Sequence, residues 1–187
     1  MIMEQLPNVI FVFADQLRLQ SLGYAGNPDV HTPNLDWLAA HSVNFTYAIS
    51  GCPVCSPARA SLLTGQYPDR HGVFVNDVNL SSQADTLQKS FKQAGYATAY
   101  IGKWHLDGHG RTAYIPPERR PYFDYWKVLE CTHDYNNSYY YEGDDPQRLT
   151  WDGYDAIAQA RDAQRYIEQQ AKKGPFFLVI IRIIVKI

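Results

Sequence analysis

The sequence predicts an α/β fold in which helices flank a mainly parallel sheet. Residues 8–13 form a continuous run of β-branched and aromatic side chains, which is typical of a strand buried on both faces. Residues 96–101 and the apolar run 176–185 are predicted strands by the same criterion. Helical patterns separate these runs, and strands joined through helices usually lie parallel, with right-handed crossovers.

Start and stop residues predict four helices. Thr32 and Ser56 are expected N-caps, each followed by a proline that suits the first helical position. The predicted helices are 33–40, 58–64, a segment from Asp85 or Thr86 to Gly95, and 152–173. Residues 43–49 are a possible further strand. Residues 107–150 show little periodicity, so we expect a loop-rich insertion there.

The composition is that of an ordinary globular protein, with 187 residues, 45% of them apolar, and a net charge of −2. This charge favours neither nucleic acid nor membrane as a partner, so an anionic ligand would have to be held by local positive groups. The three cysteines argue against a disulfide framework. Residues 1–7 carry no signal peptide, so we expect a cytoplasmic protein as written, or a periplasmic or secreted one if a signal was removed.

Asp15 and Gln16 directly follow the first predicted strand. Ligand sites of α/β sheets lie beyond the carboxyl ends of the strands. A carboxylate and an amide oxygen are hard ligands suited to Ca²⁺ or Mg²⁺. A turn or a helix cap is the alternative interpretation of this pair.

Cys55 stands at the expected start of a helix, where free N–H groups and the helix dipole favour bound anions. Arg59 lies one helical turn further on and can offer a bidentate fork to an oxyanion. Cys52 and Cys55 also form a Cys-x-x-Cys pair, which suits a redox or zinc site. No second such pair exists to complete zinc coordination, and Cys52 is expected to be a small packed residue.

Lys103 and His105 follow the strand predicted at 96–101. Alternating residues of an extended chain point the same way, so both side chains are expected to face one cleft. Lysine supplies a point charge for an anion, and histidine supplies a proton or a hydrogen bond. Alone, this segment would more often be a surface loop; together with Asp15 and Cys55 it indicates anion binding.

These motifs resemble those of a known family. Cys55-Ser56-Pro57-Ala58-Arg59 matches the sulfatase pattern Cys-x-Pro-x-Arg, and Gly102-Lys103-Trp104-His105-Leu106 is similar to the second sulfatase signature. The chain thus resembles the N-terminal part of a formylglycine-dependent sulfatase, a family with an alkaline-phosphatase-like fold. The resemblance covers residues 7–106 and, to a lesser degree, 150–180.

The resemblance implies a covalent mechanism for hydrolysis of a sulfate ester. In the family, the cysteine matching Cys55 is oxidised to Cα-formylglycine by a formylglycine-generating enzyme. One hydroxyl of the hydrated aldehyde attacks sulfur, and the other later allows sulfate to leave, which divides one hard displacement into two easier steps. By the same resemblance, Arg59 holds the nucleophile, Lys103 and His105 bind sulfate oxygens, and His105 is a candidate to assist the leaving group.

The implied metal ligands are Asp15, Gln16 and the residue derived from Cys55, with Ca²⁺ as the expected ion and Mn²⁺ or Mg²⁺ as alternatives. Many sulfatases have two aspartates where this chain has Asp15-Gln16. The Asp-Gln version resembles a branch close to phosphonate monoester hydrolases. Hydrolysis of a phosphonate or phosphate ester is therefore the alternative activity. The expected substrate is a sulfated small molecule or carbohydrate.

Family members are much longer than this chain and take further metal ligands from later strands. We therefore expect residues 1–187 to be the N-terminal part of a catalytic domain that lacks its C-terminal remainder, with a truncation or a change of frame near Ile181. Such a chain would have impaired activity, or would be an inactive fragment that binds only anions or a partner. Tyr135 and Tyr139 to Tyr141 either stack on a sugar or aryl group or pack the insertion onto the body.

Overall fold

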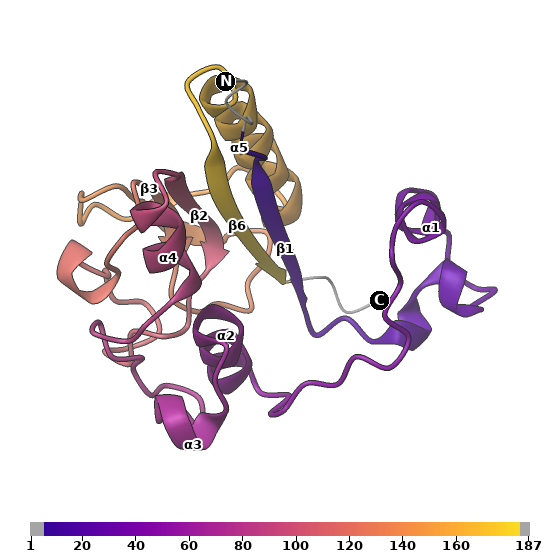
Figure 1. Cartoon of the computed structure of the whole chain (residues 1–187), viewed down its shortest axis with the longest axis horizontal. Helices are drawn as coiled ribbons and strands as arrows, with labels where there is room; N and C mark the ends of the chain where they lie inside the picture. The colour runs from indigo at the N-terminus through magenta and orange to yellow at the C-terminus, as the bar shows by residue number, and fades with distance from the viewer. Residues whose placement is uncertain (1–5, 184–187) are drawn as a thin grey trace, which may run out of the picture.

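The computed structural model describes residues 6–183. Its described strands form one six-stranded sheet in the order β1-β6-β2-β3-β4-β5 (Figure 1). β1, β6, β2 and β3 are mutually parallel, whereas β4 and β5 join as antiparallel strands. The predicted α/β fold with a mainly parallel sheet is confirmed. The strands are β1 (Val9–Asp15), β2 (Ala97–Lys103), β3 (Tyr125–Leu129), β4 (Tyr139–Glu142), β5 (Leu149–Thr150) and β6 (Phe176–Ile183).

The four predicted helices are present, three of them with different ends, and a further short helix at residues 68–71 was not predicted. They are α1 (Pro33–Ala40), α2 (Cys55–Thr64), α3 (Pro68–His71), α4 (Leu87–Gln93) and α5 (Asp155–Gln170). α2 begins at Cys55 with Val54 as N-cap, so the predicted start at residue 58 with Ser56 as N-cap is wrong. Pro57 fits inside the first turn because the first N–H groups of a helix have no intrahelical acceptor. No helix in the described range is long and apolar enough to cross a membrane.

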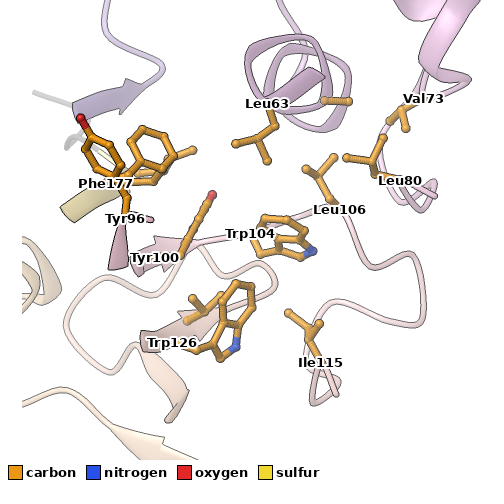
Figure 2. Packing of buried hydrophobic residues seen from close by; sticks show 14 residues of the cluster. Leu63, Val73, Leu80, Tyr96, Tyr100, Trp104, Leu106, Ile115, Trp126 and Phe177 are labelled. Atoms are coloured by element: carbon orange, nitrogen blue, oxygen red, sulfur yellow. The ribbon is translucent and has the colours of Figure 1, made fainter. Parts of the chain in front are cut away.

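Alternate residues of the central strands face two different helical layers. On one face, Ile101 and Leu178 pack with Tyr166 of α5. On the other, Tyr100 and Trp126 join a larger apolar cluster that also takes in residues from α2 and the segment after β2 (Figure 2). The labelled members of this cluster are Leu63, Val73, Leu80, Tyr96, Tyr100, Trp104, Leu106, Ile115, Trp126 and Phe177. The centre of the sheet is therefore buried on both faces.

The strand predicted at residues 43–49 is absent from the structure. Residues 43–49 form turns and irregular chain rather than a strand, and Val43, Phe45, Tyr47 and Ile49 are 77% to 93% exposed. An apolar run becomes a strand only where another strand accepts its hydrogen bonds, and no described strand pairs with this one.

Residues 107–150 are more regular than expected. They contain β3, β4 and β5 and a 3₁₀ turn at Pro117–Arg119. These strands are short, at two to five residues, and give no usable period in the sequence. The predicted strand end at 184–185, the residues 1–5 examined for a signal, and the final residues 184–187 lie outside the described range.

Candidate active site

Asp15 and Lys103 meet at one edge of the sheet because of the strand order. Each is the last residue of its strand, and β1 and β2 both pair with β6 in parallel. The carboxyl ends of parallel strands meet at one edge. Lys103 Nζ lies 3.1 Å from Asp15 Oδ2, although the two residues are 88 positions apart.

Cys55 lies directly beside this pair, as the first residue of α2. Its Sγ is 3.5 Å from Lys103 Nζ and 3.8 Å from Asp15 Oδ1. The N–H of the following residue, Ser56, donates to Asn76 Oδ1 at 2.9 Å, which caps the start of the helix. The sulfur thus sits at a helix N-terminus next to a buried ammonium, a setting that favours bound negative charge.

Arg59 completes the group from the next turn of α2. Its side chain is fully buried, with Nη2 3.1 Å from Asp15 Oδ2 and Nη1 donating to the carbonyl oxygen of Cys55 at 3.2 Å. Burial raises the pKa of Asp15, but the charges and hydrogen bonds of Arg59 and Lys103 outweigh it and hold that pKa below its usual value. The two buried cations, Arg59 and Lys103, face the single carboxylate of Asp15. These three side chains together therefore carry a net positive charge that suits an anion.

An open cavity of about 750 Å³ adjoins these residues. Asp15, Gln16, Cys55 and Arg59 lie in its wall, and the rest of the wall comes from β1, residues 48–54, α2, Leu17 and Asn76. Gln16 is exposed and has a left-handed backbone, with φ 59°. A few polar groups in a largely apolar cavity are typical of a site for a small organic ligand.

His105 has different partners from the other predicted site residues. β2 ends at Lys103 and His105 has φ 55°, so the extended geometry assumed for the pair does not reach His105. Its Nε2 lies 3.0 Å from Asp77 Oδ1, and Asp77 also accepts a fork from Arg111. Burial lowers the pKa of His105 to about 4, against the hydrogen bond to Asp77, which raises it. The imidazole is therefore neutral near pH 7.

Gly102 allows this edge of the sheet to form. Its φ is 106°, and a Cβ at this position would lie 2.1 Å from the carbonyl oxygen of Ile181 on β6. Only glycine permits both the backbone conformation and the close approach. The glycine of the Gly102–Leu106 motif thus lets β2 turn directly after Lys103 and before His105.

The described residues supply only part of a metal site. Asp15 and Gln16 offer oxygen ligands, but Asp15 Oδ2 already accepts from Lys103 and Arg59. Residues 6–183 contain no group of three or more His, Cys, Asp or Glu side chains that could hold a metal ion. Ca²⁺ takes six to eight oxygen ligands, so these residues alone do not fit it, and they form no zinc centre around Cys52 and Cys55.

The structure adds three residues that sequence reasoning missed. Asn76 caps α2, and Asp77 binds His105. Cys131, just after β3, is buried; burial raises the pKa of its thiol, and the charge of Lys103 counteracts this. All three lie in irregular chain, where no periodic pattern could indicate them. The one sequence signal for Asn76 and Asp77 is that their stretch, Gly72 to Leu80, lies close to the Cys55 motif.

The tyrosine cluster belongs mainly to the packing of the insertion. Tyr139 and Tyr141 are buried on β4, and Tyr140 stacks at a tilt on Trp151 with ring centroids 4.6 Å apart. Tyr135 is different: it is half-buried, and its hydroxyl lies 3.3 Å from His133 Nδ1. Packing therefore accounts for Tyr139 to Tyr141.

Comparison with known proteins identifies the family to which this chain belongs. A family model described as Sulfatase matches residues 7–183, which is nearly all of the described chain. The chain belongs to the sulfatase family. The Cys55 and Gly102 motifs, which supply Arg59 and Lys103 to the ion pairs with Asp15, are both inside the matched range.

Curated sulfatases align with almost the whole chain. The ulvan-active sulfatase of Formosa agariphila is 53% identical over 177 residues, which cover 95% of this chain and 35% of that protein. The endo-4-O-sulfatase of Bacteroides thetaiotaomicron is 32% identical over 217 residues, covering 93% of this chain and 42% of that protein. The chain therefore spans about a third to two fifths of the length of these relatives.

Solved structures agree on the fold. A Bacteroides fragilis protein assigned as the sulfatase YidJ superposes with a TM-score of 0.88 and 35% identity, over 95% of this chain and 43% of that one. A phosphonate monoester hydrolase of Agrobacterium radiobacter gives a TM-score of 0.65 at 23% identity over 95% of this chain. That second likeness shows a shared fold only.

Proposed function

We propose that this chain provides the nucleophile and sulfate-binding half of a sulfatase that acts on a sulfated carbohydrate. The observation that carries the proposal is the contact of Cys55 Sγ with Lys103 Nζ at 3.5 Å, at the first residue of a helix and beside buried Arg59. Membership in the sulfatase family supports the reaction type. The ulvan-active relative supports a carbohydrate as the organic part of the substrate.

Cys55 is proposed to be converted to Cα-formylglycine by a formylglycine-generating enzyme, in an oxidation that needs an external oxidant. The modified residue supplies a hydrated aldehyde as nucleophile. Arg59 holds the start of α2 through the Cys55 carbonyl, and Lys103 directs its ammonium at the side chain of residue 55. Both cations then stabilise the sulfuryl oxygens as negative charge builds up on them.

A divalent metal remains part of the proposal, with Asp15 and Gln16 as the ligands from this chain. Asp15 and Gln16 alone do not fill the coordination shell of Ca²⁺, so we propose that further oxygen ligands complete the site. Ca²⁺ addition to the chain alone should therefore give weak binding, measurable by titration calorimetry. Tight binding that survives Asp15→Ala would refute this assignment.

The main test joins mass spectrometry to a sulfate-release assay. In the native host, conversion should lower the mass of the peptide containing Cys55 by about 18 Da, because an aldehyde replaces the thiol. Cys55→Ala should abolish release of sulfate from an aryl sulfate and from sulfated ulvan fragments. Cys52→Ala is the matched control, since it removes a thiol three positions upstream and should leave release intact. An unmodified Cys55 in the native host would overturn the mechanism.

Phosphonate ester cleavage is the second candidate, and Gln16 is the observation that favours it. Matched sulfate and phosphonate esters of one phenol decide between the two activities. The proposal expects the sulfate ester to react faster at saturating concentration. A higher rate on the phosphonate ester would move the chain to the alternative reaction.

A further inference from the structure

Asn76 and Asp77 connect two parts of the site that lie far apart in sequence. Asn76 Oδ1 accepts from the N–H of Ser56, next to Cys55, at 2.9 Å. Asp77 Oδ1 lies 3.0 Å from His105 Nε2. Two consecutive residues thus hold the start of the nucleophile's helix and the histidine of the second motif. The family resemblance gave these two residues no role.

The contact with Asp77 determines which ring nitrogen of His105 carries the proton. An ionised carboxylate only accepts hydrogen bonds, so Nε2 must be the donor. Neutral His105 then has an unprotonated Nδ1. This atom is buried and has no hydrogen-bond partner in the described part of the chain, while the whole residue is only 2% exposed. A buried nitrogen without a partner requires an explanation, and a bound ligand provides one.

Arg111 fixes Asp77 from the opposite side. Its Nη2 donates to Asp77 Oδ2 at 2.8 Å and its Nε to Oδ1 at 3.0 Å, which is a bidentate fork. The backbone of Arg111 is itself held, because its carbonyl oxygen accepts from the N–H of Cys131 at 3.0 Å. The Arg111 and His105 hydrogen bonds lower the pKa of Asp77 to about 2, so this carboxyl stays ionised.

Backbone strain is found at both ends of the Asp77–His105 hydrogen bond. Asp77 has φ 64° and His105 has φ 55°, and only two other non-glycine residues in the described range have a positive φ. A left-handed backbone is uncommon at non-glycine residues, although Asp and His adopt it more readily than most, and it persists where the surroundings enforce it. Two strained residues joined by one hydrogen bond indicate that the geometry serves the site rather than local stability.

We propose that Asp77, held by Arg111, is a positioning residue that keeps the proton on His105 Nε2 and so leaves Nδ1 as a hydrogen-bond acceptor, free within residues 6–183, on the residue two positions after Lys103. This inference rests on the proposed function. Nδ1 is then a hydrogen-bond acceptor, and it can take a proton from a hydroxyl group at the reaction centre. The proton forms a new N–H bond as the O–H bond breaks, and the ionised Asp77 stabilises the imidazolium that results.

The first test measures the tautomer without requiring turnover. In the chain labelled with ¹⁵N-histidine, long-range ¹H–¹⁵N spectra near pH 7 should show His105 with its proton on Nε2, assigned by comparison with His105→Gln. Asp77→Ala should give a mixture of tautomers. Asp85→Ala is the matched control, because it removes another aspartate that pairs with a cation, Lys89, on the surface. A wild-type proton on Nδ1, or an unchanged tautomer in Asp77→Ala, would overturn the proposal.

A second variant separates positioning from charge. In Asp77→Asn the amide oxygen still accepts from Nε2–H, so the tautomer should be kept while the stabilising charge is lost. Its kcat for sulfate release should fall at least about tenfold and at most by the factor of about 10²–10⁴ that a general base contributes, with little change in KM. An unchanged kcat would refute the role of Asp77. If the wild-type chain with formylglycine at position 55 releases no sulfate even when the remaining metal ligands are supplied, the proposed function fails, and the tautomer still decides this inference.

Discussion

β1 and β2 both lie against β6 and both end in a site residue, yet their surroundings are very different. Ile101 of β2 is fully buried and packs against α5, whereas Ile10 and Val12 of β1 are 46% and 67% exposed. The chain after β2 is buried from Trp104 to Asp107. The chain after β1 passes through exposed turns and then α1, which extends away from the sheet (Figure 1).

The comparison shows that two kinds of constraint build the site. Pairing with β6 alone brings Asp15 within 3.1 Å of Lys103, even though β1 is bare on one face. Packing fixes the Lys103 side, where an apolar cluster surrounds the motif. The β1 side carries the open cavity and exposed apolar side chains, so substitutions on the two sides should differ strongly in their effect on stability.

The largest expected contrast comes from the same substitution on each strand. Ile101→Ala should lower the free energy of unfolding by about 2–5 kcal/mol, because it leaves a cavity in a closely packed core. Ile10→Ala should cost less than about 1 kcal/mol, since its side chain is half in water already. Urea denaturation of both variants measures this contrast. Equal losses would show that the bare face of β1 is covered in solution.

Alanine substitutions at two glycines test the close approach of β2 to β6 at Gly102. Gly102→Ala should destabilise by about 3 kcal/mol, because it combines an unfavourable φ with a Cβ 2.1 Å from a backbone oxygen of β6. Gly26→Ala, with φ 93° but nothing within 4 Å, should cost only about 1 kcal/mol of backbone strain. The same denaturation curves give both values. A smaller loss at Gly102 than at Gly26 would contradict the close approach.

The smallest predicted effect concerns Glu130, which follows β3 and accepts from the N–H of Asp107 at 2.9 Å. Burial raises its pKa to about 7, although the backbone hydrogen bonds oppose this. The folded state therefore binds more protons than the unfolded state between about pH 4.5 and 7. The contribution of Glu130 to the free energy of unfolding is lost as the pH rises through that window.

Glu130→Gln should remove this loss and gain about 2 kcal/mol relative to wild type at about pH 8, with no gain at about pH 4. That figure is below the full equivalent of the pKa shift, because a buried site relaxes around a charge. Thermal denaturation across this pH range provides the measurement, with exposed Glu118→Gln as control. A pH-independent difference between Glu130→Gln and wild type would show that Glu130 does not titrate as expected.

Much of the fold could be predicted from the sequence, because its signals are local. The continuous apolar runs of β1, β2 and β6 and the Pro-bearing start of α1 each depend on neighbours within a few residues. The failures are equally instructive. Residues 43–49 have the composition of a strand but no pairing partner among the described strands, and β3 to β5 are too short to show a period.

The sequence by itself determined which chemistry is available: a cysteine and an arginine one turn apart, a lysine and a histidine after a strand, and a carboxylate after another. The motifs at Cys55 and Gly102 indicated the sulfatase family. The tertiary structure determined which of these side chains are in contact. Lys103 contacts Cys55 and Asp15, whereas His105 turns to Asp77, a residue no motif indicated. Contacts across 28 to 88 positions depend on strand order and loop conformation, and no local pattern encodes either.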